Sequence, residues 1–437
     1  MVKKKVVVLG AGFGGLQAAR TFRRRSDVEV TIIDRTNHHL FQPLLYQVAT
    51  GGLNPSEIAS PVRAVLGRQK NLTSLMGNVT SVDYEHNRVE LDGGQITLEY
   101  DYLVLAMGGR TSYFGNDQWE KVAPGLKSLQ DALTIRQRVL WAFERAEKLE
   151  DGPEREKLMT IVVVGGGPTG VELAGAMAEL RRHVLRWDFK NIDPNKARVL
   201  LVEGGPGLLG AFPERLGKYA TRKLENLGVE LLFNERVKTI EAGRVVTEAR
   251  TIEAENIIWA AGVGGHELAP RLGDDRDRAG RLTVEADLHL PGRDNVYCVG
   301  DMAHYEHSQT NDGKLLPGVA QVAIQQGKLA AKNILRQLDG QPTQPFHYFD
   351  KGSMATIGRS AAVAHTPFNL QMTGPLAWLA WLFVHLMFLV DYRNRLIVLL
   401  RWTWKYFGWR WNVRLITAPP ETSEESAEEP RTPVESS

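Results

Sequence analysis

Cysteine is nearly absent from this sequence, because only one of the 437 residues, Cys298, carries a thiol. A single thiol cannot form a disulfide within the chain, so the fold does not depend on an oxidising compartment. Mechanisms that need redox-active cysteines, such as those of thioredoxin, glutathione and sulfide:quinone reductases, are excluded. Iron–sulfur clusters need several thiolates and are excluded for the same reason.

Long apolar runs are also lacking. The longest candidate, residues 376–390, contains His385 and has 15 residues, whereas a membrane-spanning helix needs about 20. Lysines 3–5 precede an apolar run at 6–9, as in a signal peptide, but the glycines from position 10 onward interrupt that run. No signal peptide is therefore expected.

Acidic residues are scarce in the last third of the chain and then concentrate at its end. Residues 421–437 contain six glutamates and one arginine among Ser, Thr and Pro, although the formal net charge of the whole chain is +2. Such a segment cannot bury enough apolar surface to fold, so residues 419–437 are predicted to form a disordered acidic tail.

Glycine, in contrast, is abundant at 42 residues, above the usual share of roughly 7%. Two segments share one plan, in which a β-branched run ends in glycines and a helical stretch follows. They are residues 6–24 and 161–185, which start 155 positions apart. Short, wholly apolar strands are typical of parallel sheets, so the sequence predicts two βαβ dinucleotide-binding units.

The first glycine motif is Gly10-x-Gly12-x-x-Gly15, with Asp34 at the end of the next apolar run, 19 residues later. The glycines allow a tight turn and close approach of a pyrophosphate, and the carboxylate accepts a hydrogen bond from a ribose hydroxyl. Far along the chain, residues 295–301 resemble the second flavin fingerprint of flavoproteins with two dinucleotide-binding domains. This resemblance implies that Asp301 binds the ribityl chain of FAD; the alternative is a carboxylate that caps a helix.

The second motif is Gly165-x-Gly167-x-x-Gly170, and its acidic partner is Glu203, 33 residues after Gly170. This spacing exceeds the usual value of about 20 because an extended helix and loop intervene. A carboxylate there favours NADH over NADPH, whose 2′-phosphate it would repel. Glu172 follows in the first helical turn, where it either complements the helix dipole or acts beside the flavin.

Four further segments resemble the type II NADH:quinone oxidoreductases: residues 44–51, 316–327, 351–359 and 392–395. The resemblance covers residues 2 to about 417. It implies a single-subunit enzyme with non-covalent FAD, NADH as substrate, a membrane quinone as acceptor, no metal and no proton pumping. The expected fold class is α/β, with two Rossmann-like domains and a C-terminal helical membrane-anchoring module.

Roles for individual residues follow from this resemblance. Glu172 and Gln321 are the catalytic candidates, and Gln321, Gln325 and Tyr46 are the quinone candidates. Gln325 could instead be a solvated helix residue, and Tyr46 a packing aromatic. The predicted contacts of FAD are Gly10, Gly12, Phe13, Gly14, Gly15, Asp34, Arg35, Gln42, Val79, Ala106, Gly108, Asp301, Ala320 and Gln321. The predicted contacts of NADH are Gly165, Gly167, Pro168, Thr169, Gly170, Glu172, Glu203 and Gly262.

The C-terminal region combines tryptophan and cations with an apolar run, which is typical of an interfacial membrane anchor. The predicted anchor residues are Trp378, Trp381, Arg393, Arg395, Arg401, Trp402, Trp404 and Lys405. A buried helix pair, a homodimer interface or a spanning helix are the alternatives. Nucleic-acid binding is disfavoured because these cations lie among aliphatic residues.

The predicted domains are an FAD domain at 1–155 and 287–345, an NADH domain at 156–286, and a membrane module at 346–418. The expected location is the cytoplasmic face of the cell membrane, as a peripheral protein. Three other functions stay open: a soluble NAD(P)H reductase of a ferredoxin or rubredoxin, a flavin-based redox sensor, and a quinone reductase for a biosynthetic intermediate.

Overall fold

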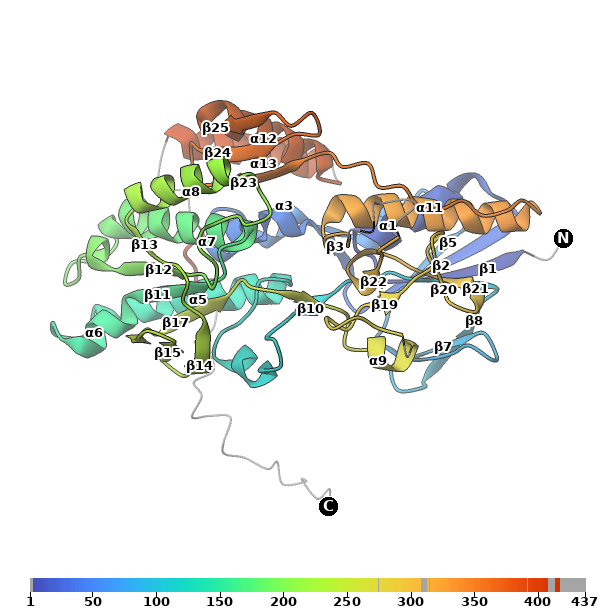
Figure 1. The fold of residues 1–437 in the computed structure, drawn as a ribbon, viewed down its shortest axis with the longest axis horizontal. Coiled ribbons are helices and arrows are strands. Elements are labelled where there is room, and N and C mark those ends of the chain that lie inside the picture. Colours follow the sequence, from blue (N-terminus) through green and yellow to red (C-terminus); the bar gives the residue numbers. More distant parts are fainter. Residues whose placement is uncertain are drawn as a thin grey trace, which may run out of the picture.

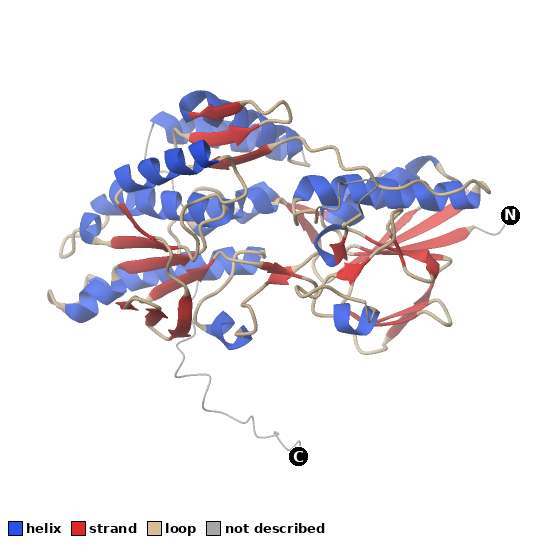
Figure 2. Cartoon of the chain, viewed as in Figure 1, coloured by secondary structure: helices blue, strands red, loops and turns tan. Residues whose placement is uncertain are grey.

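The computed structural model describes residues 3–273, 275–307, 313, 315–390, 392–407 and 413–416, with the backbone alone for 392 and 404–407. The predicted acidic tail therefore lies outside the described residues. Figures 1 and 2 show two α/β lobes side by side and a smaller module packed mainly over one of them. This arrangement confirms the predicted fold class.

The first lobe is built on a six-stranded sheet of order β20-β21-β9-β1-β2-β5. Its strands are β1 (Lys4–Leu9), β2 (Val28–Asp34), β5 (Leu72–Met76), β9 (Tyr102–Leu105), β20 (His289–Leu290) and β21 (Arg293–Cys298). All neighbours pair in parallel except β20 with β21. The chain thus enters this lobe, leaves it after β9 and returns with β20 and β21.

Helices α1 (Phe13–Thr21) and α11 (Ala320–Leu338) cover one face of this sheet together (Figure 1). They cross at two glycines, because a Cβ atom on Gly327 would overlap the carbonyl oxygen of Gly14. The first turn of α1 therefore contacts the first half of α11, although 307 positions separate the first residues of the two helices. An antiparallel sheet of β6 (Val79–Asp83), β7 (Arg88–Leu91) and β8 (Ile96–Glu99) completes the lobe.

The second lobe repeats the plan with a four-stranded parallel sheet of order β13-β12-β11-β17. Its strands are β11 (Thr160–Val164), β12 (Arg198–Val202), β13 (Val229–Leu232) and β17 (Asn256–Trp259). The helices α5 (Leu129–Ala146), α7 (Pro168–Glu179) and α8 (Glu214–Asn226) belong to this lobe. A three-stranded antiparallel sheet is formed by β14 (Val237–Glu241), β15 (Arg244–Thr247) and β16 (Thr251–Glu253).

Two short strands join the lobes. β10 (Arg110–Thr111) pairs with β18 (Val263–Gly264), so the chain segments that leave and re-enter the first lobe are hydrogen-bonded to each other. Gly109 precedes this ladder, and a Cβ there would overlap the carbonyl oxygen of Gly264 and lie 3.0 Å from the Cβ of Asp301. The ladder therefore holds the second lobe against Asp301 in the first.

The C-terminal module is not wholly helical, and this part of the prediction is corrected. Before α12 (Gly374–Phe388) and α13 (Tyr392–Phe407), the chain forms an antiparallel sheet of β23 (Ser353–Thr356), β24 (Ala362–His365) and β25 (Gln371–Thr373). The alternation of small apolar and polar residues in 353–365 is short, so it did not stand out as a strand pattern. Among the described residues, no helix is both long and apolar enough to cross a bilayer.

The crossing of α1 and α11 predicts the effect of Gly327→Ala. Alanine normally stabilises a helix relative to glycine by up to about 1 kcal/mol. Here its Cβ would meet the backbone of Gly14, and overpacking costs about 1–3 kcal/mol. Gly327→Ala should therefore lower the free energy of unfolding, measured by urea titration. Gly207→Ala, where no atom lies within 4 Å of the new Cβ, is the matched control and should change little. Equal stabilities of the two variants would contradict this account of the crossing.

Candidate active site between the two lobes

Each lobe presents a glycine turn at the carboxyl end of its first strand. A Cβ on Gly10 would overlap the carbonyl oxygen of Ala106, and one on Gly15 would overlap that of Gly10. Gly12, in contrast, faces open space, with no atom within 4 Å of an added Cβ. The turn is thus closely packed at Gly10 and Gly15 and open at Gly12. On the open side, N–H groups at the start of α1 can bind a pyrophosphate. The residues present fit FAD.

The second lobe repeats these relations. A Cβ on Gly170 would overlap the carbonyl oxygen of Gly165, whereas Gly167 has no atom within 4 Å. Pro168 and Thr169 form the first turn of α7 after this opening. Gly262 follows β17 at the same edge of the sheet with φ +76°. The predicted NADH residues are therefore brought together at one edge.

The two acidic residues hold equivalent positions. Asp34 accepts a hydrogen bond from the backbone N–H of Ala11 at 2.7 Å, and Glu203 accepts one from that of Gly166 at 2.6 Å. Each carboxylate thus joins the end of the second strand to the glycine turn. The second oxygen of Glu203 accepts from the N–H of Gly205 at 2.6 Å.

Asp301 lies at the other end of the first turn's opening. Its carboxylate pairs with the ammonium group of Lys127 at 3.2 Å, and a Cβ on Gly318 would lie 3.0 Å from its Oδ1. Sequence reasoning missed Lys127, because 174 positions separate it from Asp301 and no local pattern marks it. The Lys127 carbonyl also accepts a hydrogen bond from the predicted FAD residue Gln42 at 3.0 Å.

The other predicted FAD contacts lie around the same opening, except for Arg35 and Val79. Phe13 packs edge-on against His39 and Phe41 at the start of α1. Ala106 and Gly108 directly follow β9. Arg35 is exposed and lies 3.9 Å from Glu267 at the rim of the first lobe. Val79 is buried at the start of β6, in the antiparallel sheet.

Gln321 and Gln325 lie in the first two turns of α11, and both amides are already engaged. Gln321 donates to the carbonyl of Gly352 at 2.9 Å and accepts from the N–H of Lys351 at 3.2 Å. Gln325 donates to and accepts from the backbone of Phe349, at 2.9 and 3.0 Å. The two glutamines therefore bind the backbone of residues 349–352, the segment that leads from α11 into the C-terminal module. Gln325 is therefore not a freely solvated helix residue, so that alternative interpretation of Gln325 is wrong.

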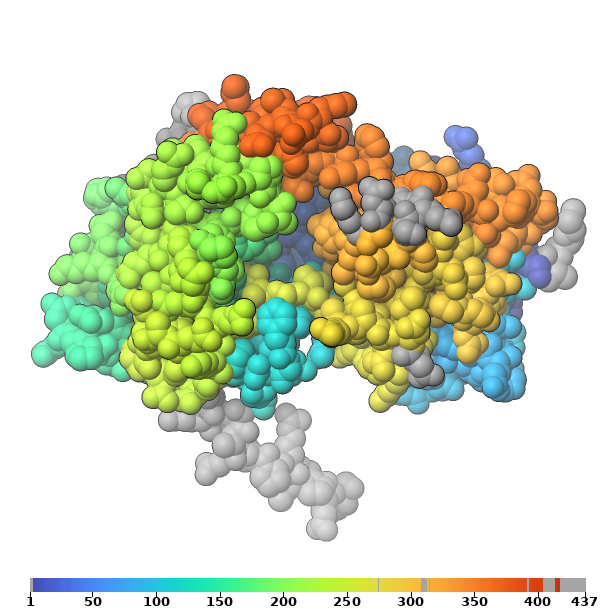
Figure 3. All heavy atoms as spheres, in the orientation of Figure 1, coloured from blue at the N-terminus to red at the C-terminus, as the bar shows by residue number. Residues whose placement is uncertain are grey.

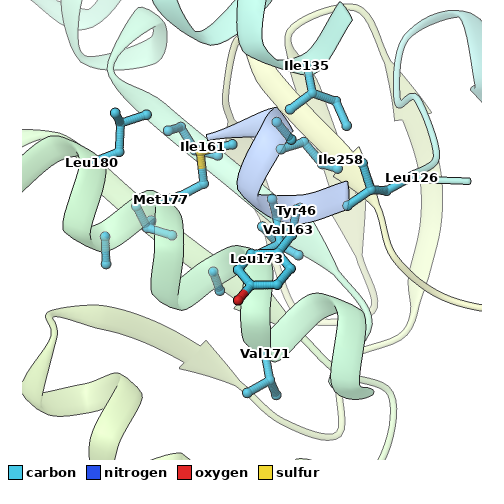
Figure 4. Close-up of a cluster of buried hydrophobic side chains, with 14 of the residues drawn as sticks. Tyr46, Leu126, Ile135, Ile161, Val163, Val171, Leu173, Met177, Leu180 and Ile258 are labelled. Atoms are coloured by element: carbon cyan, nitrogen blue, oxygen red, sulfur yellow. The ribbon is translucent and has the colours of Figure 1, made fainter. Parts of the chain in front are cut away.

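Tyr46 is a buried packing residue that also carries a polar network. Its ring lies among apolar side chains of α7 and of the second-lobe sheet, including Leu173 and Val163 (Figure 4). Its hydroxyl accepts a hydrogen bond from Gln47 at 2.9 Å and lies 3.1 Å from the hydroxyl of Thr356. Because Gln47 donates to it, the Tyr46 hydroxyl is free to donate to Thr356.

Glu172 lies beside this network. It is nearly buried, and burial raises the pKa of its carboxyl group to about 8. The backbone N–H of Thr356, 3.3 Å away, and the indole of Trp381 oppose this shift. Burial also raises the pKa of Tyr46, and the Glu172 charge adds to that rise. A carboxyl group in this environment holds a proton at neutral pH.

A cavity of about 60 Å³ lies next to this network, between α7 and the C-terminal module. Its lining includes Tyr46, Glu179, Thr356, Trp378, Trp381 and Trp402. Sequence reasoning did not connect Glu172 with the tryptophans, because they come from elements about 200 positions apart.

Among the predicted anchor residues, Trp381 is corrected, and Arg401 and Trp402 make contacts within the protein. Trp381 is 1% exposed and stacks on His385 with 4.0 Å between ring centroids, so it cannot lie in a lipid interface. Arg401 forms an ion pair with the buried Glu57. Trp402 donates to Gln47 at 3.0 Å. Arg401 and Trp402 therefore attach α13 to residues outside the module.

The remaining anchor candidates differ among themselves. Arg395 donates to the carbonyl of Leu389 at 2.7 Å, Arg393 is exposed, and Trp378 is partly exposed. The side chains of Trp404 and Lys405 lie outside the described residues. The described residues of the two helices also expose many large apolar side chains, namely Leu376, Leu379, Phe383, Met387, Phe388, Leu396, Leu399 and Leu400.

Comparisons with known proteins agree with this geometry. Residues 4–327 match the model of the pyridine nucleotide-disulphide oxidoreductase family, and residues 350–410 match that of the NDH2 C-terminal domain. Two proteins of Mycobacterium tuberculosis named type II NADH:quinone oxidoreductase, Ndh and NdhA, are 44% and 43% identical. The matches cover 95% and 93% of this chain and 90% and 88% of those proteins.

Solved structures show the same fold. NDH2 from Plasmodium falciparum superposes with a TM-score of 0.85 at 22% identity, over 94% of this chain and all of that one. The sulfide:quinone oxidoreductase of Aquifex aeolicus superposes with a TM-score of 0.70 at 20% identity, over 90% and 92%. The only thiol of this chain is fully buried in β21, and burial raises its pKa, so cysteine chemistry stays excluded.

The raised pKa of Glu172 predicts a pH-dependent stability. The ordinary pKa of this carboxyl is 4.5 and its folded value is about 8, so between these values the folded protein holds a proton that the unfolded chain has released. This contribution is fully present below pH 4.5 and is lost as the pH rises through about 8. Compared with Glu172→Gln, wild type should lose up to about 1.4 kcal/mol per pH unit across this window.

Urea unfolding of both proteins at several pH values from 5 to 9 checks this expectation. A stability difference that does not change with pH would show that Glu172 is ionised in the folded protein.

Proposed function

Because this chain belongs to the type II NADH:quinone oxidoreductases, we propose that it oxidises NADH in the second lobe and reduces a membrane quinone through FAD bound in the first lobe. The observation that carries this proposal is the position of the two glycine turns. Both lie at the carboxyl edges of parallel sheets, and the β10–β18 ladder holds Gly264 of the second lobe next to Gly109 and Asp301 of the first. Figure 3 shows the two lobes with a recess between them.

FAD, when bound, supplies hydride acceptance from NADH and electron transfer to the quinone. The chain supplies position and charge. The N–H groups at the start of α1 face the open space above Gly12, and Asp34 and Asp301 lie on either side to bind hydroxyl groups. Lys127 holds the carboxylate of Asp301 in place.

Glu203 sets the choice of dinucleotide. Its carboxylate stands at the end of β12, and its two oxygens are fixed by backbone N–H groups at 2.6 Å. A fixed negative charge there accepts a hydrogen bond from the 2′-hydroxyl of NADH and repels the 2′-phosphate of NADPH.

Glu172 is proposed as the group that exchanges a proton during turnover. A pKa of about 8 lies near the working pH, which favours proton transfer in both directions. The Tyr46 hydroxyl and Thr356 lie next to it and can orient that proton. The competing view is that Glu172 only complements the dipole of α7, which its burial disfavours because ionisation there is costly.

Quinone is proposed to reach the flavin from the side of the C-terminal module. Gln321 and Gln325 border that approach, and a quinone carbonyl would compete with the backbone of residues 349–352 for the Gln321 amide. The exposed leucines and phenylalanines of α12 and α13 fit the acyl region of a bilayer, so we propose peripheral attachment there, on the cytoplasmic side. A soluble reductase of a protein carrier would not need this surface.

Steady-state turnover tests the function directly. Purified protein should bleach its bound flavin with NADH and transfer the electrons to quinones, with kcat/KM for NADH at least about tenfold above that for NADPH. Glu203→Gln should shrink this preference, because it removes the charge and keeps an acceptor oxygen. Glu230→Gln, at the opposite end of the neighbouring strand, is the control. A flavin that stays oxidised under anaerobic excess NADH would refute the function.

Vesicle co-sedimentation tests the membrane surface. Replacing one buried apolar side chain by a charged one removes about 2 kcal/mol of burial, so Leu379→Glu and Phe383→Glu should each lower vesicle binding by about tenfold or more. Leu149→Glu, an apolar residue 38% exposed on the second lobe, should bind like wild type. Unchanged binding of the first two variants, with conversion of a dimer to a monomer, would assign this face to a homodimer instead.

A further inference from the structure

Phe114 has an unusual combination of properties. Its side chain is 69% exposed, although it is a large aromatic ring. Its backbone has φ +52°, in the left-handed region that non-glycine residues rarely adopt. Neither feature is needed for a connecting loop between β10 and the next element.

The loop that presents Phe114 is firmly fixed by its neighbours. The carbonyl of Ser112 accepts a hydrogen bond from the Trp259 indole at 2.9 Å. Tyr113 is 2% exposed and donates to the carbonyl of Ala123 at 2.9 Å. Asn116 donates to the carbonyl of Tyr113 at 3.2 Å. The exposed ring is therefore held in one place by a packed base, which is how binding residues are pre-organised.

The place where the ring is held is the nucleotide edge of the second lobe. A Cβ on Gly262 would lie 2.8 Å from the Cζ atom of Phe114, so the ring lies directly over this glycine. Gly262 follows β17, which pairs with β11 on the side opposite to β12. In Figure 3 the segment around β10, in cyan, lies between the two lobes.

The sheet order decides which half of the dinucleotide meets Phe114. Glu203 on β12 marks the adenosine side, and the turn Gly165–Gly170 over β11 marks the pyrophosphate. The other half must then extend over β17, toward Gly262. The same direction leads through Gly264 to Gly109 and Asp301, that is, toward the first lobe.

We propose that Phe114 is a binding residue for the nicotinamide half of NADH, whose ribose and ring it covers at Gly262. This inference rests on the proposed function and adds a residue that fixes the reactive end of the substrate. The ring stays exposed without ligand and becomes buried when NADH binds.

The test compares ligands that contain and lack nicotinamide, on the intact flavin-containing protein. Phe114→Ala should weaken NAD⁺ binding and raise KM for NADH by about tenfold, as expected for loss of an aromatic contact. Binding of ADP-ribose, which lacks nicotinamide, and KM for quinone should not change. Phe114→Tyr should restore the affinity for NAD⁺. Calorimetric titration gives both affinities.

A second variant separates binding from structure. Phe114→Gly should weaken NAD⁺ as Phe114→Ala does, yet raise the melting temperature, because glycine adopts φ +52° without strain. Trp187→Ala, an exposed aromatic of the same lobe away from this edge, is the control and should bind NAD⁺ normally.

Unchanged NAD⁺ affinity of Phe114→Ala, or an equal loss of ADP-ribose binding, would overturn the inference. If wild type bound NAD⁺ but NADH did not reduce the flavin, the proposed function would fail, and the ligand comparison would still decide the role of Phe114.

Discussion

The backbone contact between Gly14 and Gly327 is the constraint on which the site depends. It brings two helices that are distant in sequence into direct contact, with the first turn of α1 against the first half of α11. The turn that fits a pyrophosphate and the residues around Gln321 become parts of one surface for this reason. The Gln321 and Gln325 amides bind the backbone of residues 349–352, and this segment continues directly into β23 of the C-terminal module. The contact between two glycines thus helps to determine the positions of α1, α11 and the C-terminal module.

The local parts of the site could be predicted from the sequence, because each depends on neighbours in the chain. The glycine turns and the strand-end acids Asp34 and Glu203 are of this kind, since a turn, a helix start and a strand end lie within one βαβ unit. The apolar runs predict strands at 28–34, 102–106, 198–203 and 257–261. Strand β2 has the predicted bounds, and those of β9, β12 and β17 differ by one or two residues. The parallel sheets therefore need only the local pattern of apolar runs.

The distant parts could not be predicted in the same way. Lys127 pairs with Asp301 only because the chain leaves and re-enters the first lobe. The sequence predicts that Trp381 lies in a membrane interface, but it is buried and stacks on His385. Tryptophan is common both in interfaces and in protein interiors, and the sequence does not show which face of α12 the residue occupies. Likewise Tyr46, in a short helix, reaches the network of Glu172 through tertiary packing alone. For Lys127 and Tyr46 the deciding partner lies more than one hundred positions away.

The attachment of α13 has a practical consequence for anyone who wishes to make this protein easier to handle in water. The helix is attached to α2 (Leu45–Ala49) and α3 (Pro55–Ile58), through Trp402 with Gln47 and through Arg401 with Glu57. Cutting the chain before α13 would uncover a carboxylate that is 4% exposed and leave it without its cation, which destabilises a fold strongly. A shortened chain would therefore lose part of the stability of the fold. Replacing the exposed leucines of α12 and α13 by polar residues would keep both helices, and with them the Arg401–Glu57 ion pair and the Trp402–Gln47 hydrogen bond.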